Sequence, residues 1–370
     1  MTKAGNKKAF TFPFVAFVAF VAFSASSCSS RQSKRKLVLY TDTPESLTLE
    51  LTKRFEELYG IEVEEVLEGT SWLLTRLRAE QNHPIADVFM GASGTVPGVI
   101  GKREGLFAPY IPKNFENLPV QGGKLKLRDE DWYWTGFGFA ALGLAYDKTR
   151  TPWDELPNAW PDLAQPKWKG ELTIWDPSVS GTATLFLVAS LWRYVGQGRP
   201  EEEGWDNLRG FYRNLKKYAE EGPPAFSVSK GLVRLGVHLD NQFLYYRKKV
   251  KEGASDLSFY LPQESPILSD PLALVAQSPH PQEAKLFIDF VLSPAAQDIL
   301  STTFWIRDAK GRACLPADHP YLEAAGGSKD FNSRCLAGQI LIKDALEMDF
   351  DWMAASFDRA RVYWQNHVEE

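Results

Sequence analysis

Histidine and cysteine are scarce in this chain of 370 residues, which contains five histidines and three cysteines. The histidines are scattered without the close spacing that zinc ligands require, so the sequence predicts no bound metal and no other cofactor. Nucleophile-elbow, phosphate-binding-loop and zinc-protease motifs are also missing, which disfavours the enzymes that use them. We therefore expect a protein without catalytic activity. The alternative is a secreted hydrolase with a nucleophile and a base in its binding site.

Basic residues are outnumbered by acidic ones, 42 to 47, which gives a net charge of -5. Residues 1–27 contain three lysines and no acid, so the remainder has 39 basic and 47 acidic side chains and a net charge of -8. This balance argues against nucleic acid as a partner. A basic cluster does lie in residues 29–36, which we interpret as a solvated tether that could touch anionic lipid.

The sequence also lacks an apolar run long enough for a transmembrane helix. The uncharged segment from Ala9 to Phe23 covers 15 residues and contains Pro13, whereas a spanning helix needs roughly 20. Lysines before it and small residues after it indicate an export signal. Because Cys28 follows, we predict a lipoprotein-type signal over residues 1–28 with membrane lipid attached to Cys28. The protein would then lie in the periplasm or on the outside of the cytoplasmic membrane; cleavage without lipidation is the alternative.

From Lys36 onwards, strand and helix patterns alternate, which predicts parallel βαβ units and an α/β fold. About 340 residues remain after the signal, too many for a single core, so we expect two lobes. A Gly- and aromatic-rich segment from Tyr133 to Tyr146 is predicted to be a strand that leaves the first lobe for the second. The main predicted elements are strands at 37–40, 61–66, 86–90, 171–175 and 234–239, and helices at 44–59, 72–81, 181–195, 205–218 and 242–251, with a short helix between prolines within 152–165.

Nine short segments, in sequence order, support a family resemblance. They are Leu37-Val-Leu-Tyr-Thr41, Gly69-Thr-Ser-Trp-Leu-Leu-Thr-Arg-Leu77, Ala86-Asp-Val-Phe-Met-Gly91, Glu104-Gly-Leu-Phe-Ala-Pro109, Trp134-Thr-Gly-Phe137, Gly143-Leu-Ala-Tyr146, Pro166-Lys-Trp-Lys-Gly-Glu-Leu172, Asp176-Pro-Ser-Val-Ser-Gly-Thr182 and Ala284-Lys-Leu-Phe-Ile-Asp-Phe-Val-Leu-Ser-Pro294. Together they resemble the ferric-ion-type branch of ABC-transporter extracellular solute-binding proteins, which includes binders of phosphonates, sugar phosphates and thiamine. The resemblance covers nearly all of residues 36–305.

This resemblance implies a two-lobed periplasmic-binding-protein fold of type II, with a small-molecule ligand held in the cleft between the lobes. It also implies delivery of the ligand to an ABC permease in the cytoplasmic membrane. We expect a first lobe from residues 37–138 and 268–310, and a second lobe from 139–267. Residues 311–370 would form a C-terminal connection and helices that pack on the lobes.

Candidate ligand-binding residues follow the carboxyl ends of the predicted strands, where open α/β sheets bind their ligands. In the second lobe, Ser180 would cap a helix, Gly181 would let a ligand approach the backbone, and Thr182 would add a hydroxyl. Free amides at such a helix start favour an anion; the alternative is that Ser180 only caps its own helix. The remaining candidates are Thr41, Asp42, Thr70, Ser71, Ala92, Ser93, Trp134, Asp240 and Asn241.

The carboxylates of Asp42 and Asp240 modify the expected ligand, because they would repel phosphate but accept an amine. Either could instead cap a helix or turn, and Trp134 could stack on an organic ligand or pack in the core. We therefore expect a small solute with a phosphoryl or phosphono group, with Asp42 or Asp240 available to an amine.

Ferric iron is the alternative ligand within the same family. Its iron-binding members place two adjacent tyrosines directly after a strand-ending asparagine, whereas Asn241 is followed by Gln242 and Phe243. Tyr245 and Tyr246 come three residues later, about 4.5 Å further along a helix. This displacement disfavours iron, although the two tyrosines stay the candidate iron ligands.

Outside the cytoplasm, the cysteines can be accounted for simply. If Cys28 takes lipid, Cys314 and Cys335 remain as a possible disulfide. Two unpaired thiols are the alternative.

Overall fold

Nine strands of the described chain form a single sheet. The computed structural model describes residues 35–250, 256–308, 312–324 and 328–369. The strands are β1 (Lys36–Thr41), β2 (Glu62–Leu67), β3 (Val88–Met90), β4 (Phe107–Ala108), β7 (Thr135–Asp147), β8 (Leu172–Thr173), β9 (Leu235–Leu239), β10 (Leu257–Tyr260) and β11 (Ile267–Val275). Their order is β2-β1-β3-β11-β7-β9-β8, with β4 beside β11 and β10 beside β7.

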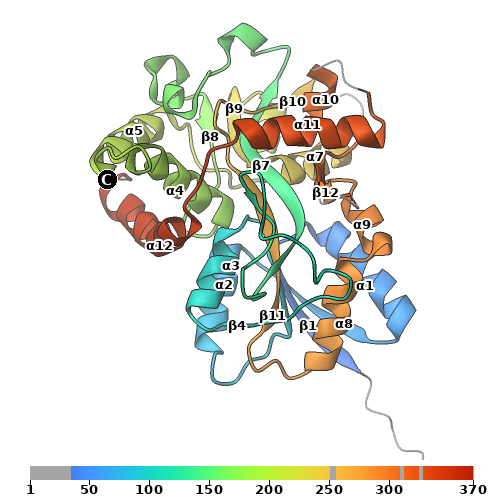
Figure 1. The fold of residues 1–370 in the computed structure, drawn as a ribbon. Coiled ribbons are helices and arrows are strands. Elements are labelled where there is room, and N and C mark those ends of the chain that lie inside the picture. Colours follow the sequence, from blue (N-terminus) through green and yellow to red (C-terminus); the bar gives the residue numbers. More distant parts are fainter. Residues whose placement is uncertain (1–34, 251–255, 309–311, 325–327, 370) are drawn as a thin grey trace, which may run out of the picture. The chain divides into compact units, whose positions relative to one another are not determined.

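Two antiparallel strands, β7 and β11, run through the middle of this sheet (Figure 1). Residues 135–141 of β7 pair with β11, and residues 142–147 pair with β9 and β10. Likewise, β11 pairs with β7 at one end and with β3 and β4 at the other. The sheet therefore has a first half around β1 to β4 and a second half around β8 to β10, and β7 and β11 belong to both.

Parallel pairing occurs within each half, between β1 and its neighbours β2 and β3 and between β8 and β9. The prediction of parallel units is thus right for these strands, whereas the crossing strands pair antiparallel. The predicted lobe boundaries stay a prediction, because residues 35–370 form one compact unit.

Helices of the first half are α1 (Glu45–Tyr59), α2 (Thr70–Ala79), α3 (Val96–Arg103), α8 (Pro281–Val291) and α9 (Pro294–Leu300). As predicted, Gly60 ends α1, with a left-handed φ of 64°. The sequence did not predict α3, because Gly98 and Gly101 are poor helix formers. Both are glycine for a packing reason: a Cβ at Gly98 would lie 2.8 Å from Trp134, and one at Gly101 would lie 2.0 Å from Phe107.

In the second half, the main helices are α4 (Gly181–Val195), α5 (Glu201–Asn214), α6 (Pro224–Ser229) and α7 (Asp240–Lys249). The predicted bounds of α4 are correct, and α7 begins two residues before its predicted start. The short helix predicted within residues 152–165 is present as two 3₁₀ segments, Trp153–Glu155 and Trp160–Ala164, and not as an α-helix. Prolines at 152, 157 and 161 interrupt α-helical hydrogen bonding there.

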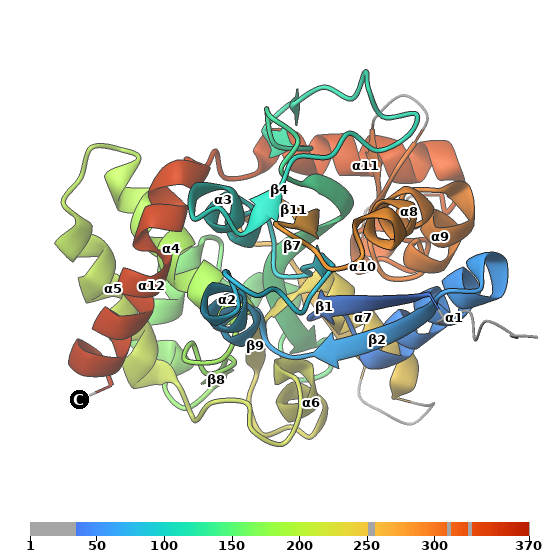
Figure 2. The same ribbon diagram turned by 90° about the horizontal axis from the view of Figure 1, so that it is seen from below.

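The C-terminal region adds α10 (Pro320–Ala324), α11 (Phe331–Asp344) and α12 (Phe350–His367). Figures 1 and 2 both show α12 beside α4 and close to α3, so this helix contacts both halves. Asp358 of α12 pairs with Arg78 of α2 at 2.9 Å, and Arg359 pairs with Glu201 of α5 at 2.7 Å. One apolar cluster extends from β1 and α3 through β7 to α4 and α12.

Candidate ligand-binding site

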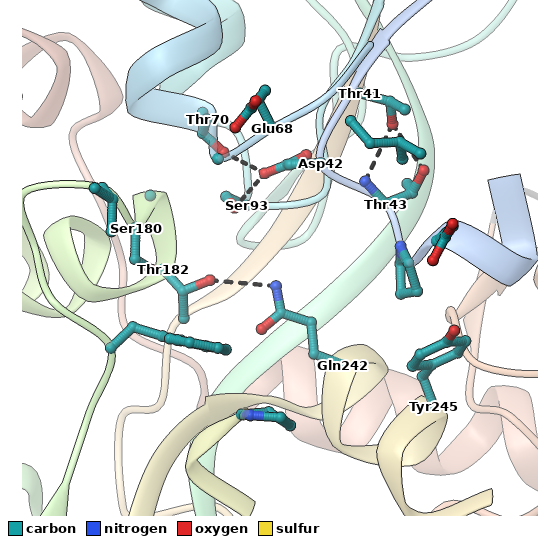
Figure 3. A pocket seen from close by; sticks show the side chains of 18 of the residues that line it. Thr41, Asp42, Thr43, Glu68, Thr70, Ser93, Ser180, Thr182, Gln242 and Tyr245 are labelled. Carbon is teal, nitrogen blue, oxygen red and sulfur yellow. Dashed lines mark hydrogen bonds between the residues drawn. The ribbon is translucent and has the colours of Figure 1, made fainter. Parts of the chain in front are cut away.

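A cavity of about 750 Å³ lies where the two halves of the sheet meet (Figure 3). From the first half it is lined by Thr41, Asp42, Thr43, Pro44, Glu45, Leu67, Glu68, Gly69, Thr70 and Ser93. From the second half it is lined by Trp175, Val179, Ser180, Gly181, Thr182, Pro223, His238, Gln242, Tyr245, Tyr246 and Lys249. Most of these residues follow the carboxyl end of a strand or begin a helix, which is where α/β sheets bind ligands.

In the first half, the polar lining is organised around Asp42, which directly follows β1. The hydroxyl of Ser93 donates to a carboxylate oxygen of Asp42 at 2.6 Å. The hydroxyl of Thr70 and the amide of Ala92 donate to the same carboxylate. Burial raises the pKa of Asp42 above its usual range, although these hydrogen bonds act in the opposite direction. Figure 3 shows the three side chains grouped at one side of the cavity.

At the edge of this group, two glycines bring the halves into direct contact. A Cβ at Gly181 would lie 2.7 Å from the hydroxyl oxygen of Thr70 and 3.0 Å from the Cβ of Ser93. A Cβ at Gly69 would lie 2.5 Å from the carbonyl oxygen of Val179. Only glycine allows these approaches. In this structure Gly181 therefore makes room for the opposite half of the protein, whereas the sequence predicts that it makes room for a ligand.

The first turn of α4 supplies the second-half donors. The side chain of Ser180 is the N-cap and accepts a hydrogen bond from the amide of Ala183 at 3.2 Å. The amides of Gly181 and Thr182 come at the very start of the helix, where N–H groups have no intrahelical acceptor. The Thr182 hydroxyl accepts a hydrogen bond from Gln242 of α7 at 3.5 Å. Ser180 thus does cap α4, and it also lines the cavity.

A buried histidine, His238 of β9, forms part of the same wall. Its side chain is 0% exposed, and neither ring nitrogen has a partner among the described residues. Burial lowers the pKa of His238 to about 3, so the ring is neutral at physiological pH. The side-chain oxygen of Gln242 is also buried and without a described partner. The ring nitrogens of His238 and the side-chain oxygen of Gln242 are therefore uncharged groups in the second-half wall that can form hydrogen bonds with a ligand.

Tyr245 and Tyr246, the candidate iron ligands, both line the cavity but point to different partners. The Tyr245 hydroxyl lies 2.8 Å from the Ser46 hydroxyl of α1, and the Tyr246 hydroxyl lies 2.9 Å from the Ser229 hydroxyl of α6. Neighbouring residues on a helix are about 100° apart around its axis, which accounts for the divergence. Although burial raises the pKa of Tyr245, hydrogen bonds with Lys249 and Ser46 lower it overall.

Comparison with known proteins identifies the family. The model of the bacterial extracellular solute-binding protein family matches residues 83–318. The chain belongs to this family.

Several relatives and solved structures resemble this solute-binding protein. A probable ABC transporter periplasmic-binding protein, y4fP, of Sinorhizobium fredii is 28% identical over 239 residues, covering 62% of each chain. The Fe(3+)-binding periplasmic protein of Serratia marcescens is 25% identical over 274 residues, which cover 72% of this chain and 74% of the relative. The periplasmic binding protein AfuA of Actinobacillus pleuropneumoniae, solved with fructose-6-phosphate, has a TM-score of 0.70 at 22% identity, covering 91% of this chain and 99% of that one. These similarities support the predicted two-lobed type II fold.

Seven predicted ligand-binding residues of the solute-binding protein line its cavity: Thr41, Asp42, Thr70, Ser93, Ser180, Gly181 and Thr182. Ser71 and Asn241 are buried and do not line it. Ala92 is buried as well and contributes its amide to Asp42.

Asp240 and Trp134 require correction, because neither lines the cavity. The carboxylate of Asp240 is fully buried and accepts from the Ala141 amide at 3.0 Å, the Trp305 indole at 2.7 Å and His319 at 3.0 Å. It therefore joins β7 to the C-terminal region and is not available to an amine on a ligand. Trp134 is 1% exposed and packs against Gly98 of α3, so it is a core residue.

Sequence reasoning missed Glu45, Glu68, His238, Gln242 and Lys249, all of which line the cavity. Glu68 directly follows β2, so the rule that selected Asp42 would also have selected it. His238 lies in β9 between the buried Val237 and Leu239, and strand alternation places it on the opposite face. The helix periodicity of α7 contained no comparable signal for Lys249.

Two further predictions concern regions away from the cavity. The structure joins Cys314 and Cys335 by a disulfide. Among the described residues, Asp308 lies close to these two cysteines, but cysteines joined in a disulfide offer no thiolate to a metal, and the group does not line the cavity. The predicted signal and Cys28 lie outside the described residues. No helix in the described part of the chain combines the length and apolarity that a membrane span needs.

Proposed function

We propose that this protein is the solute-binding component of an ABC importer and that it carries a small phosphorylated or phosphonate-type organic solute to a membrane permease. The observation that carries the ligand class is the first turn of α4. There, Ser180 satisfies the Ala183 amide, which leaves the Gly181 and Thr182 amides at the positive end of the helix dipole beside the cavity. Family membership supports the transport role.

The opposite wall supports a ligand that is not purely anionic. Asp42, Glu45 and Glu68 line the first-half side, and Glu45 and Glu68 are exposed. These carboxylates would repel a second phosphate and would accept hydroxyl or ammonium groups. The cavity volume of about 750 Å³ suits an organic molecule better than a bare ion. We therefore place the oxyanion at α4 and the polar organic part toward Glu45 and Glu68.

Thermal-shift screening of metal-free protein tests the ligand class directly. We expect stabilisation by sugar phosphates or aminophosphonates, and none by thiamine, polyamines or ferric citrate. The Ser180 hydroxyl accepts from the Ala183 amide and, in this proposal, donates its own proton to the oxyanion. In Ser180→Ala, affinity for the solute found should therefore fall roughly tenfold or more, since a hydrogen bond to an anion contributes about 1.5–3 kcal/mol. Asp349→Ala is the matched control, because Asp349 caps α12 by accepting from the Trp352 amide at 2.9 Å but does not line the cavity. Equal loss of affinity in both variants would show that general destabilisation, and not ligand contact at Ser180, explains the effect.

Ferric iron is the second candidate, favoured by the presence of Tyr245 and Tyr246 in the cavity and by the lowered pKa of Tyr245. Iron bound by phenolates gives a visible absorption band, so titration with ferric citrate is decisive. A band lost in Tyr245→Phe, together with no response to any phosphorylated solute, would replace the phosphate proposal by the iron one. Turnover assays on the same solutes would reveal the hydrolase alternative.

We also propose that lipid on Cys28 holds the protein at the outer face of the cytoplasmic membrane. The motivation is the position of Cys28 after an apolar run and small residues. Detergent partitioning of wild type and Cys28→Ser from a bacterial host tests this proposal. We expect only the wild type in the detergent phase; equal membrane retention of the two proteins would exclude acylation at Cys28 as the anchor.

A further inference from the structure

We propose that Asp42 is an anion built into the protein: its carboxylate occupies the oxyanion position of the first half and shapes the surface on which the second half closes. This inference deepens the proposed function, because it specifies which half receives the ligand's oxyanion.

Three donors converge on Asp42 from two segments of the chain, the start of α2 and the residues that follow β3. The Ala92 amide follows β3, the Thr70 hydroxyl begins α2, and the Ser93 hydroxyl comes from the next residue after Ala92. One amide and two hydroxyls form the kind of neutral donor set that binds carboxylate or phosphate groups in proteins. Because Asp42 already accepts from all three, a second anion at this position would find these donors occupied and would meet a negative charge. The ligand's oxyanion is thereby directed to α4.

The same two hydroxyl residues form the contact surface for the second half. Gly181 approaches Thr70 and Ser93 so closely that its Cβ, if present, would lie 2.8 Å from the Thr70 Cβ and 3.0 Å from the Ser93 Cβ. Since Asp42 fixes the Thr70 and Ser93 side chains by hydrogen bonds, it also fixes the surface that Gly181 meets. We call Thr70 and Ser93 the seat of Gly181.

It follows that the halves meet at this point through protein atoms alone, with Asp42 supplying the negative charge. A bound solute then lies next to the seat, on the side of Gln242 and Tyr245. It does not lie between Gly181 and Thr70. Asp42 acts as a specificity residue, because its charge excludes solutes that carry an oxyanion at both ends.

Replacing Asp42 by alanine should recreate an empty oxyanion site. Thermal unfolding is measured over a millimolar range of sodium acetate, which replaces the deleted carboxylate, with chloride keeping the ionic strength constant. We expect acetate to raise the unfolding midpoint of Asp42→Ala by several degrees in a saturable way. Wild type and Asp131→Ala should not respond; Asp131→Ala removes the same charge from a side chain that is 69% exposed. Absence of the saturable response in Asp42→Ala, or an equal response in the controls, would overturn the proposal.

Gly181→Ala tests the seat without disturbing Asp42, and it remains informative if Asp42→Ala does not fold. Alanine at the first position of α4 does not disfavour the helix, so the close contact of its Cβ with Thr70 and Ser93 should be relieved by separation of the halves. Energy transfer between dyes on the two halves should report a larger mean separation in Gly181→Ala than in wild type. In Gly122→Ala, where the nearest atom to the new Cβ is 3.3 Å away, the separation should not change.

Equal separations in wild type and Gly181→Ala would contradict the proposal that Gly181 meets Thr70 and Ser93 in the closed protein. Neither measurement uses the transported solute, so failure of the phosphate assignment would leave both results interpretable.

Discussion

Asp270 is a buried carboxylate that none of the ligand-binding arguments uses. It lies in β11, where the pairing register with β7 shifts, and its side chain is 0% exposed. One carboxylate oxygen accepts from the Gly94 amide at 2.9 Å, and the other has no partner among the described residues. Burial raises the pKa of Asp270 well above its usual range, and the nearby Asp42 and Asp240 add to this effect.

A raised carboxyl pKa makes the folded state bind a proton more readily than the unfolded state. The stabilising contribution is therefore complete below about pH 4 and is lost as pH rises through the folded-state pKa. We expect the free energy of unfolding to fall by up to about 1.4 kcal/mol per pH unit in that window. Asp270→Asn should flatten this dependence, and the exposed Asp131→Asn should not. Urea unfolding from acidic to neutral pH measures the effect; parallel curves for wild type and Asp270→Asn would exclude it.

At the scale of single residues, the sequence predicts best where a local rule applies. Ser180, Gly181 and Thr182 follow from helix-start chemistry, and the structure places all three beside the cavity. The same kind of local rule is wrong for Asp240, because its three donors come from residues 141, 305 and 319, which are far apart in the chain. No local sequence pattern shows that these three residues come together. The hydrogen-bond partners of Asp42 could not be predicted from the sequence for the same reason.

Among the elements, the connection before α11 depends on the Cys314–Cys335 disulfide, whose cysteines are 21 residues apart. For a loop of this length the chain-entropy model gives a stabilisation of roughly 3 kcal/mol. Replacing both cysteines by serine should lower the free energy of unfolding by about that amount. Thiol labelling of the unfolded but unreduced protein should find neither Cys314 nor Cys335. Labelling of both would show that the pair does not form.

Helix α12 depends on Trp364, which is 0% exposed and whose indole donates to Tyr218 at 2.8 Å. Trp364→Ala should lower the free energy of unfolding by about 3–5 kcal/mol, because it leaves a large cavity between α12 and the second half. Val362→Ala on the same helix is the control, since Val362 is 47% exposed. Denaturant unfolding of the two variants should separate them clearly. A small loss in Trp364→Ala would mean that α12 contributes little to the fold.

Helices were predicted correctly where the apolar periodicity was strong. They were missed where tertiary packing required residues that are poor helix formers. The apolar run of α4 gave its bounds directly. In contrast, α3 contains two glycines that are required by Trp134 and Phe107, and these partners cannot be known before the fold. Tertiary packing thus overrode local propensity in α3.

For the whole molecule, we expect the halves to change their separation about β7 and β11, since each strand belongs to both halves. Small-angle scattering should give a smaller radius of gyration at saturation with the transported solute than without it. The contacts of Gly69 and Gly181 with the opposite half define the closed arrangement. An unchanged radius of gyration at saturation would count against closure about these strands.

The fold class was predictable at this scale because many weak motifs occur in the right order along the chain. The sequence also predicted a crossing strand from Tyr133 to Tyr146, and β7 occupies 135–147. It could not show that α12 would contact both halves, because the residues involved, such as Asp358 and Arg78, are separated by 280 positions.

The position of β11 in the sheet also constrains the order in which the protein can fold. β3 has β1 on one side and β11 on the other, yet β11 begins at residue 267, after the whole second half has been synthesised. Until then, one edge of β3 is an unpaired strand edge, which is prone to wrong pairing. Contacts between segments so distant in sequence form slowly. The first half therefore completes its sheet late, and a fragment that ends before residue 267 should aggregate when expressed alone.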